Sequence, residues 1–102
     1  MVRQSSDPRA EFQRLRRESQ RLRAESVRTR IETALSFCAI AEHDPRPDCA
    51  RTQSLLSHIR HSIEELQWHI TEPDHLSEEA ARDLGQRLIE LKRRADRLEN
   101  PQ

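Results

Sequence analysis

The spacing of Gly and Pro, the residues that break helices, limits which folds this sequence can form. The chain contains one Gly and five Pro, and neither residue type occurs between Pro8 and Pro45. Pro is tolerated in the first turn of a helix but not in its interior. The sequence therefore predicts one helix from about residue 8 to residue 43, which is roughly 50 Å long at about 1.5 Å per residue.

A proline-rich segment at residues 43–48 ends this helix, because each Pro disfavours helical geometry in the residue before it. Asp48 can cap the next helix. Apolar residues continue at helical spacing until the chain meets Pro73. We therefore expect a second helix over about residues 48–71.

Ser77 and the two Glu residues that follow it mark the start of a third helix. Ser is a favoured N-cap residue, and acidic side chains stabilise the positive end of the helix dipole. This helix is predicted over residues 77–99. The three helices would form a single domain at residues 8–100, preceded by a flexible N-terminus at residues 1–7.

Each predicted helix carries one apolar seam with alternating steps of three and four residues. The seams are Ala24, Val27, Ile31, Ala34, Cys38 and Ala41; Leu56, Ile59, Ile63, Leu66 and Ile70; and Ala81, Leu84, Leu88, Leu91, Ala95 and Leu98. Short loops make consecutive helices antiparallel. The fold class is therefore predicted to be all-α, an up-down-up three-helix bundle with coiled-coil packing.

Composition supports a folded, soluble chain. Of the 102 residues 35% are charged and 33% hydrophobic, and no apolar run reaches the about 18 residues needed to span a membrane. Eighteen basic residues balance eighteen acidic ones, whereas disordered chains usually carry a large net charge. Two Cys are too few for a disulfide framework, and the first residues lack the apolar stretch of a signal peptide. We expect a cytoplasmic protein without a membrane partner.

The first helix is longer than the bundle, because the second helix folds back along it only to about residue 20. It also carries a second apolar face, more than about 100° from its seam. That face comprises Phe12, Leu15, Leu22, Phe37 and Ile40. Burying each of these side chains is worth about 1.5 to 3 kcal/mol. Since two-fold homodimers are the commonest oligomers, we predict that a second copy covers this face and completes the bundle.

Two polar residues on the same face, Ser26 and Thr33, divide it. The sequence therefore predicts two apolar patches on one line and not a continuous coiled-coil seam. The alternative is a frayed N-terminus with scattered apolar residues at the surface.

A histidine-rich face with an exposed Trp is predicted on the second helix. Trp68 lies nearly opposite the seam of that helix, beside His58, His61, Glu65 and His69. Trp is enriched at binding hot spots, so this face is a candidate interaction patch. The His and Glu residues are spaced i,i+4, which suits a metal or acid-base site but also suits ordinary helix-stabilising pairs. A metal or hydrolytic site is the third hypothesis, and we assign no catalytic, cofactor-binding or metal-ligating residue.

Two resemblances to known families can be drawn. Arg51 and His58 have the Arg-x6-His outline that resembles the nuclease motif of HEPN domains, which implies an all-helical dimer with a shared basic cleft. Residues 30–99 resemble the helical hairpins of tetratricopeptide or MIT domains, and the segment 91–99 resembles the last MIT helix. The second resemblance implies a hairpin fold that binds peptides. Neither assigns the chain to a family.

Charge is distributed unevenly along the chain. Residues 1–31 hold nine Arg and four acidic residues, whereas residues 32–79 hold three Arg and ten acidic residues. A basic helical arm can neutralise phosphates, but pairing of that arm with the acidic middle of another copy explains the same asymmetry. We therefore predict a non-enzymatic interaction or scaffolding module without a cofactor. The alternative is nucleic-acid binding through the Arg-rich first helix.

Overall fold

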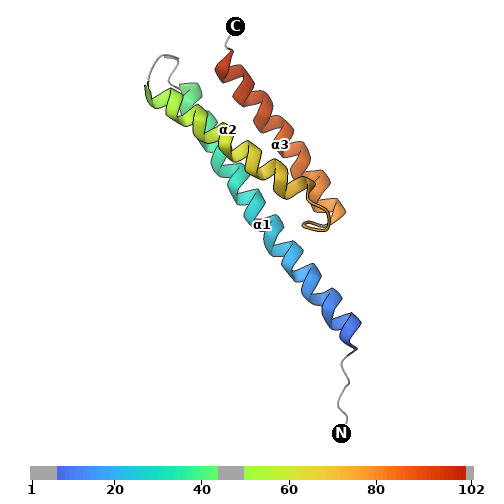
Figure 1. Cartoon of the computed structure of the whole chain (residues 1–102). Helices are drawn as coiled ribbons and strands as arrows, with labels where there is room; N and C mark the ends of the chain where they lie inside the picture. The colour runs from blue at the N-terminus through green and yellow to red at the C-terminus, as the bar shows by residue number, and fades with distance from the viewer. Residues whose placement is uncertain (1–6, 44–49, 101–102) are drawn as a thin grey trace.

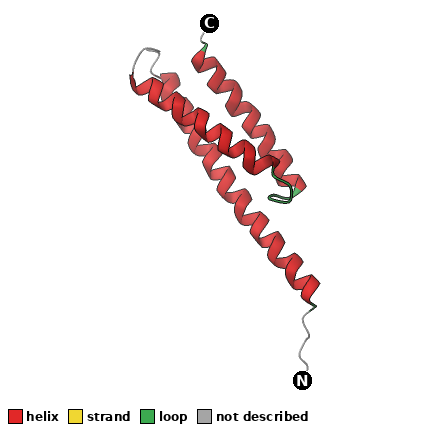
Figure 2. Ribbon diagram, viewed as in Figure 1, coloured by secondary structure: helices red, strands yellow, loops and turns green. Residues whose placement is uncertain are grey.

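The computed structural model describes residues 7–43 and 50–100 and shows three helices, of which consecutive ones run antiparallel (Figures 1 and 2). They are α1 (Pro8–His43), α2 (Ala50–Thr71) and α3 (Glu78–Glu99). Each helix contacts both of the others, and no strand occurs in the described residues. The predicted all-α, up-down-up three-helix bundle is confirmed.

Capping residues explain where α1 and α3 begin. The Asp7 carboxylate accepts a hydrogen bond from the Arg9 backbone at 3.1 Å, and Pro8 occupies the first helical position. Ser77 accepts from the Ala80 backbone at 3.2 Å, as predicted for the N-cap of α3. The predicted start of the second helix at residue 48 and the flexible segment up to residue 6 lie outside the described residues.

The three predicted seams meet along the axis of the bundle. Ile59, Leu66, Leu84 and Leu91 are completely buried, and Leu76, in the loop between α2 and α3, belongs to the same core. The other buried seam residues are Val27, Ile31, Ala34, Cys38, Ala41, Leu56, Ile63, Leu88 and Ala95. Apolar burial of this extent is the main source of stability in a domain of this size.

The loop between α2 and α3 marks how far the bundle extends along α1. Asp74 has a left-handed backbone (φ 61°), a conformation that Asp tolerates better than most residues. Its carboxylate pairs with Arg16, and its carbonyl accepts from Gln20 at 3.0 Å. The next carbonyl, of His75, accepts from Arg23 at 3.0 Å. The N-terminal turns of α1 before these contacts extend beyond the bundle (Figure 1).

None of the three described helices combines the length and apolar character required to cross a membrane.

Candidate interaction surface

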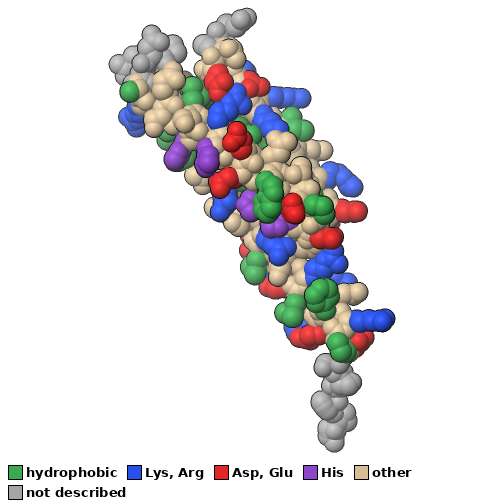
Figure 3. All heavy atoms as spheres, viewed as in Figure 1, with side chains coloured by type: hydrophobic (Ala, Val, Ile, Leu, Met, Phe, Trp, Pro, Cys, Tyr) green, Lys and Arg blue, Asp and Glu red, His purple; other side chains and the backbone are tan. Residues whose placement is uncertain are grey.

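The second face of α1 is largely uncovered in the single chain. The exposed fraction is 67% for Phe12, 54% for Leu15, 52% for Leu22 and 44% for Ile40. Hydrophobic side chains accordingly recur on the surface of the free end of α1 (Figure 3). The sequence prediction of an apolar face turned away from the core is confirmed for these four residues.

Phe37 differs from the other four residues predicted on this face. It is half-buried, packs against the core, and its ring centroid lies 5.8 Å from that of His58 on α2. Its position on the helix turns it towards α2, so part of its apolar surface is already covered within one chain. Phe37 therefore joins the second face of α1 to the histidine-rich face of α2.

Three of the polar residues between the apolar ones bond their hydroxyl groups to the backbone of α1. The hydroxyls of Thr29, Thr33 and Ser36 each donate to the backbone carbonyl four residues earlier, at 3.0 Å. We call the uncharged line along α1 the outer stripe; it consists of Phe12, Leu15, Ser19, Leu22, Ser26, Thr29, Thr33, Ser36 and Ile40.

Trp68 is 54% exposed, as its position opposite the seam predicts. Its ring lies edge-on to His69 at 5.1 Å and to His75 at 5.5 Å between centroids. Nδ1 of His69 lies 3.0 Å from Nε2 of His75, so one ring donates a hydrogen bond to the other. We call these three residues the Trp68 cluster.

Two cations border the Trp68 cluster. Nη1 of Arg30 lies 3.5 Å from Nε2 of His69, and Arg23 donates to the carbonyl of His75. Burial lowers the pKa of His75, and the charges of Arg23 and His69 lower it further, against a smaller opposing effect of Glu72. The neutral form of His75 is therefore favoured at physiological pH.

His75 is the member of this cluster that sequence reasoning missed. It follows Pro73 in a loop, where helical periodicity cannot predict which way a side chain points. The spacing of Trp68 and His69 at the end of α2 was the only available signal. By contrast, the structure does not bring His61 and Glu65 into the cluster; both are exposed on α2, and His58 lies at the other end beside Phe37.

The metal hypothesis concerns the His and Glu residues spaced i,i+4 on α2. In the described parts of the chain, no group of three or more His, Cys, Asp or Glu side chains is arranged to hold a metal ion. His61 and Glu65 are exposed on one face of a single helix, whereas protein metal sites combine at least three ligands in a sheltered position.

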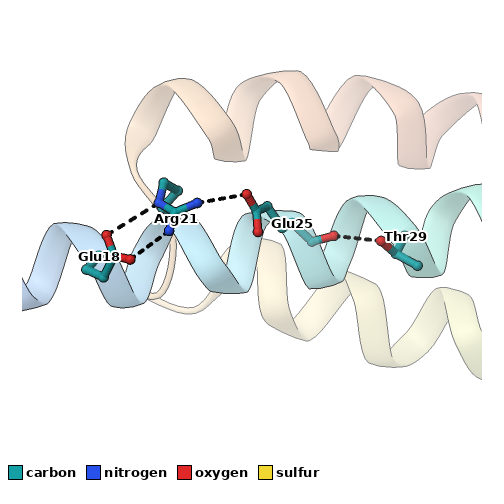
Figure 4. A network of polar contacts seen from close by, with 4 residues as sticks. All are labelled: Glu18, Arg21, Glu25 and Thr29. Atoms are coloured by element: carbon teal, nitrogen blue, oxygen red, sulfur yellow. Dashed lines mark hydrogen bonds and ion pairs between the residues drawn. The ribbon is translucent and has the colours of Figure 1, made fainter.

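Arginines of α1 pair with carboxylates of the same chain. Arg21 binds Glu18 at 2.6 Å and Glu25 at 2.8 Å, and the carbonyl of Glu25 accepts from Thr29 (Figure 4). These contacts lower the pKa of Glu18, chiefly through its hydrogen bond from Arg21. The ionised form of Glu18 is thus favoured by a contact within its own helix.

Contacts between α1 and the rest of the bundle also involve arginine. Arg16 reaches Asp74, and Nη2 of Arg28 lies 3.7 Å from a carboxylate oxygen of Asp83 on α3. The uneven charge of the sequence therefore has a partial explanation within one chain. Arg16 and Arg28 each have a carboxylate partner within the chain.

No protein family, curated protein or solved structure matches this chain. The resemblances to HEPN, tetratricopeptide and MIT domains thus rest on the quoted residues alone.

Proposed function

We propose that this chain is a small, non-enzymatic interaction module that self-associates through the outer stripe of α1. The observation that carries the proposal is the exposure of Phe12, Leu15 and Leu22, each more than half accessible in a chain with few large apolar residues. The composition that suggested a cytoplasmic setting, with two Cys and many charges, is compatible with this role.

The position of these residues supports an assembly role over scattered surface exposure. Phe12 and Leu15 occupy the part of α1 where the bundle offers no neighbour, and every residue from Pro8 to Leu15 is exposed. A helix gains most of its stability from packing one face against another element. A second polypeptide would supply that packing for the free end of α1.

The absolute mass in solution, measured by light scattering after gel filtration, tests this function. We expect a dimer that Phe12→Asp or Leu22→Asp dissociates while the helix content of the bundle persists. Ile89→Asp is the matched control, because Ile89 is 49% exposed on α3, away from the stripe. A wild-type chain that is monomeric at every concentration, or a dimer unaffected by both stripe variants, contradicts the proposal.

Nucleic-acid binding through α1 is the second hypothesis from the sequence. It is less favoured because Arg14 and Arg21 each pair with a carboxylate of the same chain. If it holds, affinity falls steeply with added salt and with charge reversal at Arg16, Arg17 and Arg23. Absence of binding to DNA and RNA at low ionic strength removes this hypothesis.

A further inference from the structure

The two edges of the outer stripe carry opposite charges. In a heptad notation that places Phe12 and Ile40 at a and Leu15 and Leu22 at d, the whole stripe occupies a and d positions. The g positions are Glu11, Glu18, Glu25 and Glu32, and the e positions are Arg9, Arg16, Arg23 and Arg30. One edge of the stripe is therefore uniformly acidic over four heptads, and the other uniformly basic.

Contacts within the chain hold the acidic edge in place. Glu11 binds Arg14 at 2.7 Å, and Arg21 bridges Glu18 and Glu25 on the side away from the stripe (Figure 4). These carboxylates remain about half exposed, at 49% to 56%. A carboxylate has about four acceptor sites, so each retains the capacity to bind a second donor.

The basic edge is held by α2 and its following loop. Arg16 contacts Asp74, Arg23 contacts the His75 carbonyl, and Arg30 lies beside His69. A guanidinium group has five donors, and these contacts use only a few of them. The side chain of Arg16 is still 44% exposed.

Only one orientation of two such stripes matches these charges. In a parallel pair, a g residue of one helix meets the e residue five positions later in the other helix, so Glu faces Arg on both sides. In an antiparallel pair, g meets g and e meets e. That arrangement would oppose Glu to Glu and Arg to Arg along the whole contact.

We propose that two copies of this chain pair through their outer stripes as a parallel, in-register, two-stranded coiled coil. Glu11, Glu18 and Glu25 of each copy pair with Arg16, Arg23 and Arg30 of the other. The inference rests on the proposed function and adds the partner's identity, its polarity and the register. The partner is a second copy because the charged edges of the stripe are complementary to each other.

The residues of the stripe fit a two-stranded assembly of moderate strength. Leu at d, as at Leu15 and Leu22, is typical of parallel dimers, and polar residues at a specify register at a cost in stability. Ser19, Ser26 and Thr33 are such residues. The strongest contacts would thus lie in the protruding part of α1, and the two bundles would sit side by side at the same end of the dimer.

Disulfide trapping shows directly whether the two α1 helices of the dimer are parallel or antiparallel. In a Cys49→Ser background, Ser19→Cys and Ser26→Cys are made separately and exposed to oxidised glutathione; native Cys38 is completely buried. A parallel, in-register pair brings each new thiol opposite its own counterpart, so both variants form covalent dimers. An antiparallel pair can do this for at most one of them. Gln13→Cys, an exposed b position in the same part of α1, is the control and remains uncross-linked.

The outcomes separate the two proposals. A light-scattering dimer in which both Cys variants cross-link and the control does not supports the parallel pairing. A dimer in which only one or neither variant cross-links overturns the parallel, in-register arrangement but leaves self-association standing. A chain that stays monomeric overturns both.

Charge reversal at the edges gives an independent test. Glu18→Arg alone opposes two arginines on both sides of the parallel dimer, and Arg23→Glu alone opposes two glutamates. Each variant should self-associate about tenfold more weakly in sedimentation equilibrium. The double variant Glu18→Arg with Arg23→Glu restores opposite charges and should recover most of the affinity. No weakening in the single variants, or no recovery in the double variant, overturns the proposed edge pairs.

Discussion

The two ends of α1 have similar side chains but different surroundings. From Val27 to Ala41 the helix lies between α2 and α3, and its seam is buried to 2% exposure or less. From Pro8 to Leu15 every residue is exposed, although this segment includes Phe12. The comparison shows that the neighbours supplied by the fold, and not the hydrophobicity of a residue, decide which apolar face becomes core.

The two parts of α1 also differ in the interactions that stabilise them. In the bundle, apolar burial stabilises each turn of α1 against two other helices. In the protruding part, the described contacts are local, such as the pair between Glu11 and Arg14. Exposed pairs at this spacing contribute about 0.2 to 0.5 kcal/mol each. The free end of α1 therefore depends on continuity with the bundle, or on a partner.

Leucine truncation provides the largest expected contrast between the two regions. Leu66→Ala removes a fully buried side chain and should lower the free energy of unfolding by about 2 to 5 kcal/mol. Leu15→Ala, at a site that is 54% exposed, should change it by about 0.5 kcal/mol or less in the monomer. Urea unfolding followed by circular dichroism, at concentrations below self-association, measures both. Equal losses would show that the protruding part also belongs to the cooperative core.

Removal of residues 1–15 should separate assembly from folding. The contacts from Arg16, Gln20 and Arg23 to the loop between α2 and α3 remain, so the shortened chain should still melt cooperatively. Its free energy of unfolding should change by less than about 1 kcal/mol. Self-association should become undetectable by light scattering, because Phe12 and Leu15 are absent. A shortened chain that fails to fold would show that the bundle requires residues 1–15 for its stability.

The bundle could be predicted from sequence because its signals are local and periodic. Steps of three and four residues identified the buried seams, and Ser77 identified the start of α3. The same periodicity placed Trp68 at the surface. Each of these features depends on the position of a residue within its own helix.

Features that depend on the contact between helices could not be predicted in this way. The partial burial of Phe37 follows from the approach of α2 at His58. The meeting of His75 with Trp68 follows from a loop that turns at Asp74. The contacts of Arg16, Arg23 and Arg30 with α2 and the loop that follows it depend in the same way on how the helices approach one another.

An ion pair between helices gives a smaller and pH-dependent contrast. Glu42 near the end of α1 binds Arg94 of α3 at 2.6 Å, and this hydrogen bond lowers the pKa of Glu42 despite opposition from burial. A carboxyl whose pKa is lower in the folded state stabilises the fold above its unfolded pKa, and that contribution disappears as the pH falls through its folded pKa. Since the Glu42 side chain is 42% exposed, the effect should be about 1 kcal/mol at most.

Glu42→Gln should therefore lower the free energy of unfolding at pH 7 and reduce its dependence on pH below about 4.5. Glu11→Gln is the control from the protruding part, where the pair with Arg14 lies within a single helix. Its monomer should show no measurable change in urea unfolding. If the two variants behaved alike, the pair between α1 and α3 would contribute no more than a local one.

The smallest effect on stability is expected from the Trp68 cluster. This cluster lies at the junction between the two parts of α1, because Arg23 of α1 binds the carbonyl of His75. Burial and Arg23 lower the pKa of His75, so its contribution to stability is present above the unfolded value of 6.5 and is lost as the pH falls through the folded pKa. Protonated imidazole quenches indole fluorescence, and His75 lies 5.5 Å from Trp68 between ring centroids. As the pH is lowered, the fluorescence emission of Trp68 should therefore decrease, with a midpoint below pH 6.5.

His75→Gln should remove this component of the titration, whereas His61→Gln, at an exposed site outside the cluster, should leave it unchanged. A midpoint above pH 6.5, or a curve that His75→Gln does not alter, would contradict the assigned contact.

Removal of residues 1–15 should leave the midpoint in place, because the cluster and Arg23 lie on the bundle side of the boundary. A midpoint that moved on this truncation would mean that the protruding turns of α1 influence the packing of the loop, and the boundary between the two regions would then lie further into the bundle than Arg16.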